Sequence, residues 1–80
     1  MSNSEKYEKA FVESFEISPE EAKKLTYQAI PAWDSVGHMD LIATLEETFD
    51  IMMETDDIID FNSFDKGIEI LEKYHINMDL

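Results

Sequence analysis

The sequence predicts an all-α fold, a small four-helix bundle with a long first loop and a short third helix. Three observations support this prediction. Apolar residues recur at intervals of three and four positions, which is the period of one helix face. Serine or threonine precedes most of the helical runs, in the position that caps a helix. No alternating run of β-branched residues indicates a strand.

The first helix is expected over residues 4–15, where aromatic side chains recur every fourth residue. Its buried stripe is Tyr7, Phe11 and Phe15. Ser18 then precedes Pro19 and two glutamates, a pattern that predicts a cap and a short turn of helix through residue 24.

Residues 25–33 are expected to form the long first loop, because Ile30 precedes a proline and is therefore disfavoured in helical backbone. The apolar anchors of this loop are Leu25, Tyr27, Ile30 and Trp33. A connection of this length in so small a domain is usually functional or closely packed.

The second helix is expected to begin with Ser35 as its N-cap and to continue to Phe49. The stripe expected to face the core is Leu41, Leu45 and Phe49, packed on Tyr7, Phe11, Met53, Ile68 and Leu71. A second apolar line around the same helix is Val36, Met39 and Ala43. The pattern leaves open whether this second line is buried or forms an exposed partner surface.

The third helix is expected to be very short, with Thr55 as its cap, two aspartates in its first turn and its end near residue 61. Ser63 is the expected cap of a fourth helix over residues 64–74. The buried face of that helix is predicted to be Phe64, Ile68, Leu71 and Tyr74. The tail, residues 76–80, is expected to fray.

Composition limits the function. The 80 residues make one domain, residues 1–80, without a cysteine that could form a disulfide or a thiolate metal site. No signal peptide and no membrane-spanning run is visible, so we expect a cytoplasmic monomer that does not insert into membranes. The net charge is −13, and residues 26–65 contain no lysine or arginine. Such a surface repels nucleic acid and attracts basic protein patches, although an acidic surface can also serve solubility alone.

Catalytic and metal-binding patterns are absent from the sequence. Ser35 and His38 are three residues apart, but no G-x-S-x-G elbow surrounds the serine and no third group is indicated. An EF-hand loop needs glycine at its sixth position and glutamate at its twelfth. Placing either Gly37 or Gly67 at the sixth position fails to supply that glutamate, so no metal site is predicted.

The stretch Trp33-Asp34-Ser35-Val36-Gly37-His38-Met39 is the most specific pattern in the chain. Together with residues 41–49 it closely resembles the modification site and second helix of acyl carrier proteins. The length, the acidity, the long first loop and the short third helix fit the same family, so the resemblance covers nearly the whole chain and implies an acyl-carrier-protein-like bundle.

The resemblance implies a function without catalysis. A phosphopantetheinyl transferase would attach 4′-phosphopantetheine from coenzyme A to Ser35, and the arm would carry acyl groups as thioesters. Acyl-loading and acyl-processing enzymes would grip the second helix through basic patches. The contact residues carried over by position are Asp34, Val36, Met39, Asp40, Ala43, Glu46 and Glu47. Met52 and Met53 are expected in the core, where they could adapt to an acyl chain lodged between helices.

Two residues depart from the pattern of bacterial fatty-acid carriers: Trp33 precedes the aspartate, and Val36 follows the serine in place of leucine. They favour a dedicated pathway for a specialised lipid, polysaccharide or secondary metabolite over housekeeping fatty-acid synthesis. Two alternatives stay open. One is an aminoacyl carrier, for example for alanine, and the other is an acidic protein-interaction module in which Ser35 is only a helix cap.

Overall fold

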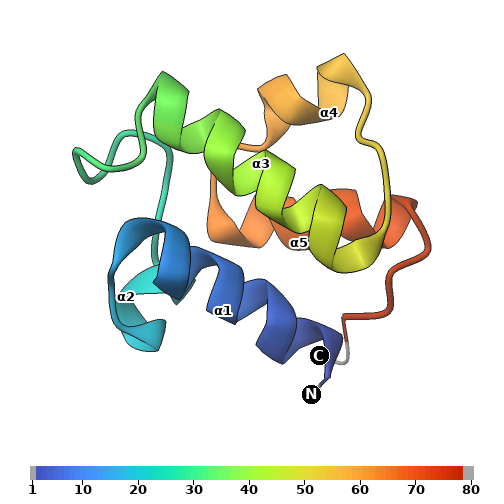
Figure 1. Ribbon diagram of the computed structural model, residues 1–80, viewed down its shortest axis with the longest axis horizontal. Helices are drawn as coiled ribbons and strands as arrows, with labels where there is room; N and C mark the ends of the chain where they lie inside the picture. Colours follow the sequence, from blue (N-terminus) through green and yellow to red (C-terminus); the bar gives the residue numbers. More distant parts are fainter. Residues whose placement is uncertain (1, 79–80) are drawn as a thin grey trace.

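Five helices account for the regular structure of residues 2–78, the part of the chain that the computed structural model describes (Figure 1). They are α1 (Asn3–Phe15), α2 (Pro19–Lys23), α3 (Ser35–Phe49), α4 (Thr55–Asp60) and α5 (Phe64–Lys73). The described residues contain no strand, only an isolated antiparallel bridge between Thr26 and Ser63. The all-α prediction is therefore confirmed, and the short turn after Ser18 is a helix of its own. No helix within residues 2–78 combines the length and the apolar character needed to cross a bilayer.

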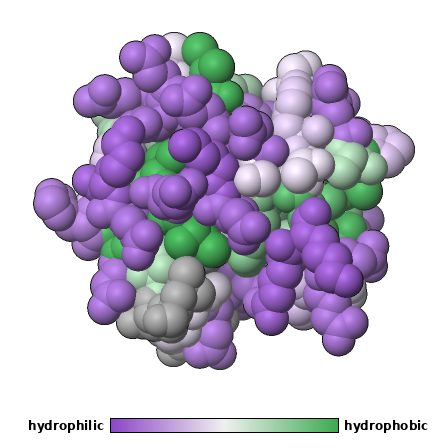
Figure 2. All heavy atoms as spheres, turned by 180° about the vertical axis from the view of Figure 1, so that it is seen from behind, coloured by the Kyte–Doolittle hydropathy of each residue, from purple (hydrophilic) through white to green (hydrophobic). Residues whose placement is uncertain are grey.

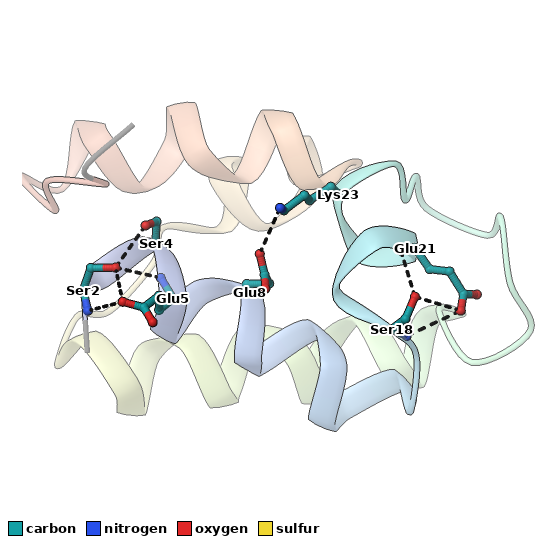
Figure 3. Close-up of polar contacts among 7 residues, drawn as sticks. All are labelled: Ser2, Ser4, Glu5, Glu8, Ser18, Glu21 and Lys23. Carbon is teal, nitrogen blue, oxygen red and sulfur yellow. Dashed lines mark hydrogen bonds and ion pairs between the residues drawn. The ribbon is translucent and has the colours of Figure 1, made fainter.

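Capping boxes fix the starts of the first two helices. The Ser2 hydroxyl accepts the Glu5 N–H at 3.2 Å, and the Glu5 carboxylate accepts the Ser2 N–H in return. Ser18 and Glu21 repeat this exchange at the start of α2, where Pro19 takes the first helical position (Figure 3). Each box satisfies N–H groups that have no partner inside their helix.

An aromatic cluster forms the centre of the core. Phe11 on α1 lies edge-on to Trp33, with ring centroids 5.5 Å apart, and 5.0 Å from Phe64. Leu41 and Leu45 of α3 are fully buried against this core, as the stripe predicted. Phe49 is only half-buried, because it is the last residue of α3 and lies at the edge of the core.

The buried face of α5 differs from the predicted one. Its buried residues are Phe64, Gly67, Ile70 and Leu71, whereas Ile68 and Tyr74 are half-buried. Gly67 explains the shift, since a Cβ there would come within 2.1 Å of the Tyr7 hydroxyl oxygen and 2.3 Å of Phe61 Cζ. The glycine thus leaves room for the Tyr7 and Phe61 side chains against α5. Tyr7 donates its O–H to the Phe64 carbonyl at 2.6 Å, and burial raises the pKa of its phenol well above the usual value.

The segment after α5 is better anchored than predicted. Met78 is completely buried, and Asn3 donates its side-chain amide to the Asn77 carbonyl at 2.9 Å. The expectation of a frayed tail is therefore wrong for residues 76–78, because the methionine fills part of the core. Residues 79 and 80 lie outside the described part of the chain.

A buried carboxylate holds the short helix α4 against α5. Asp57 accepts hydrogen bonds from Lys73 Nζ at 2.7 Å and from the Tyr74 hydroxyl at 2.5 Å. The Tyr74 oxygen accepts the Glu54 N–H at 2.8 Å, which extends the network to the start of α4. Glu54 is the N-cap of α4 and Thr55 is its first helical residue, so the prediction that Thr55 caps this helix is wrong. The bond from Lys73, followed by that from Tyr74, lowers the pKa of Asp57 below its usual value.

Candidate site at the start of helix α3

Asp34, not Ser35, is the N-cap of α3. Its Oδ1 accepts the Gly37 N–H at 2.8 Å, and its carbonyl accepts the His38 N–H at 2.8 Å. The prediction that Ser35 caps the helix is therefore wrong. Aspartate and serine are equally good N-cap residues, and here Asp34, which precedes Ser35, is the N-cap.

Ser35 consequently becomes the first residue of α3 and is exposed. Its hydroxyl has no hydrogen-bond partner among residues 2–78, and the N–H groups of Ser35 and Val36 have none there either. These N–H groups lie at the positive end of the dipole of a 15-residue helix. The junction therefore presents a nucleophilic oxygen beside donors suited to an anion.

Close backbone packing shapes this junction. A Cβ at position 37 would come within 1.9 Å of the Ala32 carbonyl oxygen, so the loop can lie against the first turn of α3 only because Gly37 has no side chain. The loop is tied to itself as well: Gln28 N–H binds the Trp33 carbonyl at 3.0 Å, and Trp33 N–H binds the Ile30 carbonyl at 3.1 Å. The placement of Ser35 follows from this folded loop.

Two hydrogen bonds link the side chain of His38 to Trp33 in the loop and to Ile58 in α4. Trp33 Nε1–H donates to His38 Nδ1 at 2.9 Å, and His38 Nε2 lies 2.7 Å from the Ile58 carbonyl oxygen. An indole N–H can only donate and a carbonyl can only accept, so Nδ1 acts as the acceptor and Nε2 as the donor in these two bonds. Both ring nitrogens are thus occupied, and His38 is not available as a base for Ser35.

The second apolar line of α3 is exposed, which answers the question that the sequence left open. Val36 is 77% exposed and Met39 is 53% exposed, and Ala43 is exposed beside them. The acids predicted to flank this line, Asp34, Asp40 and Glu47, are also exposed. On the neighbouring helix α4, Ile59 is 70% exposed. The sequence analysis missed this residue, although the adjacent pair Ile58-Ile59 in a short helix requires one of the two to face outward.

Two residues assigned from the sequence lie elsewhere than expected. Glu46 is half-buried, and its carboxylate accepts the Met53 N–H at 2.9 Å, so it stabilises the connection after α3. Met53 is buried as predicted, but Met52 is 85% exposed and is not part of the core. The two adjacent methionines therefore lie on opposite sides of this connection, one in the core and one in solvent.

Several hollows indent the described part of the molecule, and two of them lie in different places relative to Ser35. One, of about 230 Å³, is lined by Tyr27, His38, Ile59, Phe61 and Asn62 and therefore opens one helical turn from Ser35. The other, of about 390 Å³, lies between α1 and α5 and has no lining residue from α3. The Lys23–Glu8 ion pair, 3.7 Å long, lies at the edge of this second hollow (Figure 3). The face opposite to that of Figure 1 is mostly hydrophilic, with smaller hydrophobic areas between (Figure 2).

Comparison with known proteins assigns no family to the chain. The chain matches no protein-family model, and no curated protein and no solved structure is significantly similar to it. No group of three or more histidine, aspartate or glutamate side chains within residues 2–78 is placed to hold a metal ion.

Proposed function

We propose that the chain is a carrier protein that receives 4′-phosphopantetheine on the Ser35 oxygen. The observation that carries this proposal is the exposed Ser35 hydroxyl at the first position of α3, without a partner in the described residues because Asp34 performs the capping. A serine engaged as a cap would have to give up that bond before it could react. Here no such exchange is needed.

The residues around Ser35 fit a phosphodiester. The N–H groups of Ser35 and Val36 are available as donors, and the helix dipole favours a negative charge at this end. The negative charge of the nearby Asp34 carboxylate would repel that of the phosphodiester. Asp34 is exposed and already accepts the Gly37 N–H, so solvent and dissolved ions weaken this repulsion. When bound, the arm would supply a terminal thiol that holds an acyl group as a thioester.

The exposed face of α3 supports the docking of partners next to the attachment point. Val36 and Met39 supply apolar contact area, and Asp40 and Glu47 supply charge that attracts basic patches. The protein itself would hold and present the group, and the chemistry would take place in partner enzymes. Acyl groups of a fatty-acid-type or specialised lipid, polysaccharide or secondary-metabolite pathway are the proposed cargo, with an aminoacyl group as the alternative.

One observation favours a second candidate function. The exposed apolar side chains of Val36 and Met39 on α3 and Ile59 on α4, surrounded by acids, would serve equally well in an acidic interaction module without any prosthetic group. The two candidates differ only in what happens to the Ser35 oxygen. A test of covalent modification therefore separates them.

The test is intact-mass spectrometry after incubation with coenzyme A and a broad-specificity phosphopantetheinyl transferase. The wild type should gain one phosphopantetheine, and Ser35→Ala should gain none. Ser14→Ala removes a different serine hydroxyl, on α1, and should be modified like the wild type. If the wild type stays unmodified with several transferases, the carrier proposal fails and the interaction module remains.

A further inference from the structure

His38 forms a hydrogen bond with a polar group on each side of its ring. On one side is the carbonyl of Ile58, in the last turn of α4, where carbonyls have no partner inside their own helix. His38 Nε2–H donates to this oxygen at 2.7 Å and so caps the C-terminal end of α4 from α3. Since α4 has only six residues, one such bond is a large share of what holds its end.

On the other side is the indole of Trp33, which is completely buried. A buried N–H without an acceptor is costly, and His38 Nδ1 supplies the acceptor at 2.9 Å. The imidazole also lies nearly parallel to the indole, with an interplanar angle of 18°. Trp33 stands two residues before Ser35, within the loop that lies against the first turn of α3.

We propose that His38 is a positioning residue that couples the placement of α4 to the loop–helix junction presenting Ser35. A single rigid ring joins the two, so the end of α4 cannot move away without breaking a bond to that ring. The consequence for function rests on the proposed modification of Ser35. A partner that contacts the exposed Ile59 and displaces the end of α4 would thereby change how the Ser35 oxygen is presented.

A second network holds α4 from the neighbouring residue, Asp57. Asp57 binds Lys73 and Tyr74 of the α5 region, with no member of that network on the loop or on α3. The structure therefore offers a matched control: Asp57→Asn loosens α4 while both bonds of the His38 ring stay intact, so the junction should change less than when a bond of the ring is removed.

Two substitutions each remove one of the two hydrogen bonds of the His38 ring and keep the other. The amide oxygen of His38→Asn takes the place of Nδ1 and can still accept from Trp33, but its amide does not reach Ile58. The longer side chain of His38→Gln places its amide nitrogen where Nε2 stood, so it can donate to Ile58 and leaves Trp33 without its acceptor. Hydrogen exchange measured by NMR would follow the α4 amides, the Trp33 indole N–H and the Gly37 amide, which reports the junction.

In His38→Asn, we expect the α4 amides and the Gly37 amide both to exchange about tenfold faster, the factor that roughly one net hydrogen bond represents. In His38→Gln, the indole N–H and the Gly37 amide should exchange faster while α4 stays protected. In Asp57→Asn, which keeps both bonds of the ring, the α4 amides should exchange faster and the Gly37 amide should change less than in the His38 variants. If the Gly37 amide keeps its wild-type rate in both His38 variants, or changes equally in Asp57→Asn, the coupling is refuted.

Transferase kinetics extend the test to function. The KM of the transferase for His38→Asn should rise about tenfold with kcat nearly unchanged, because the oxygen is displaced but not chemically altered. An unchanged KM beside a normally modified wild type would refute the functional part of the inference while leaving the carrier proposal intact. A wild type that is never modified would refute the carrier proposal, and the exchange rates would still decide the coupling.

Discussion

Replacing Gly37 by alanine tests whether the loop before α3 lies where the structure places it. The new Cβ would stand 1.9 Å from the Ala32 carbonyl oxygen, so the two must separate by about 1.5 Å to reach an ordinary contact of 3.4 Å. The obstacle is backbone, which cannot rotate away as the end of a side chain can. The loop itself must move.

The net effect combines two opposing terms. Alanine favours helical backbone over glycine by at most about 1 kcal/mol. Overpacking a close contact costs about 1–3 kcal/mol, and each loop hydrogen bond that breaks as Ala32 retreats costs about 1 kcal/mol more. The bonds at risk are those from Gln28 to Trp33 and from Trp33 to Ile30. We expect a net loss of about 1–3 kcal/mol in the free energy of unfolding.

Thermal unfolding followed by far-UV circular dichroism measures this loss. A domain of this size should lose about 4–8 °C in Tm for each kcal/mol. Val36→Ala is the control, since Val36 is 77% exposed and its truncation changes the same turn of helix without a clash. Its Tm should stay within about 4 °C of the wild type. A Gly37→Ala protein as stable as the wild type, or more stable, would show that the Ala32 carbonyl does not approach the helix.

Three further predictions follow from the charges. Bonds from Lys73 and Tyr74 lower the pKa of Asp57, so their stabilisation is present above the unfolded-state pKa of about 3.9 and is lost as pH falls through the lower folded value. Asp57→Asn should therefore lower Tm at neutral pH, and the difference from the wild type should shrink in acid; a constant difference would contradict the pairing. The net charge is −13, and residues 2–78 contain only two ion pairs, so most of the acidic side chains repel one another. Added NaCl or MgCl₂ should screen this repulsion and raise Tm. A Tm that does not respond to salt would show that the repulsion is already compensated within the fold. Asp40→Lys with Glu47→Lys should raise the transferase KM about tenfold without changing the helical spectrum, and an unchanged KM would place docking elsewhere.

The sequence was sufficient to predict the helices and much of the core. Four-residue spacing located α1 and the buried pair Leu41 and Leu45, because one helix face must exclude water along its whole length. Caps located α2 and α5, since Ser18 and Ser63 each bind an N–H three residues on. These features depend on residues a few positions apart in the sequence, so the sequence pattern is enough to predict them.

Features that depend on distant segments could not be predicted in the same way. The burial of Gly67 follows from its contact with Tyr7 and Phe61, and that of Met78 from the space the core leaves open. The role of His38 requires knowing that Ile58 lies beside it, twenty residues along the chain. A histidine on a helix face gives no such information by itself.

The error at the start of α3 concerns the site directly. Asp34 and Ser35 are both good caps, and local pattern alone does not decide between adjacent candidates. The close packing of Ala32 on Gly37 fixes the path of the loop and the aspartate becomes the cap. This error strengthens the functional proposal, because the serine is then not needed for capping and its oxygen is exposed to a modifying enzyme.

The most direct test of the central claim is the mass of the protein purified from its own cells, followed by fragmentation to locate any adduct. We expect a population carrying one phosphopantetheine, with the added mass on the peptide that contains Ser35. A protein that is unmodified in every growth condition, in cells shown to modify another carrier, would contradict it.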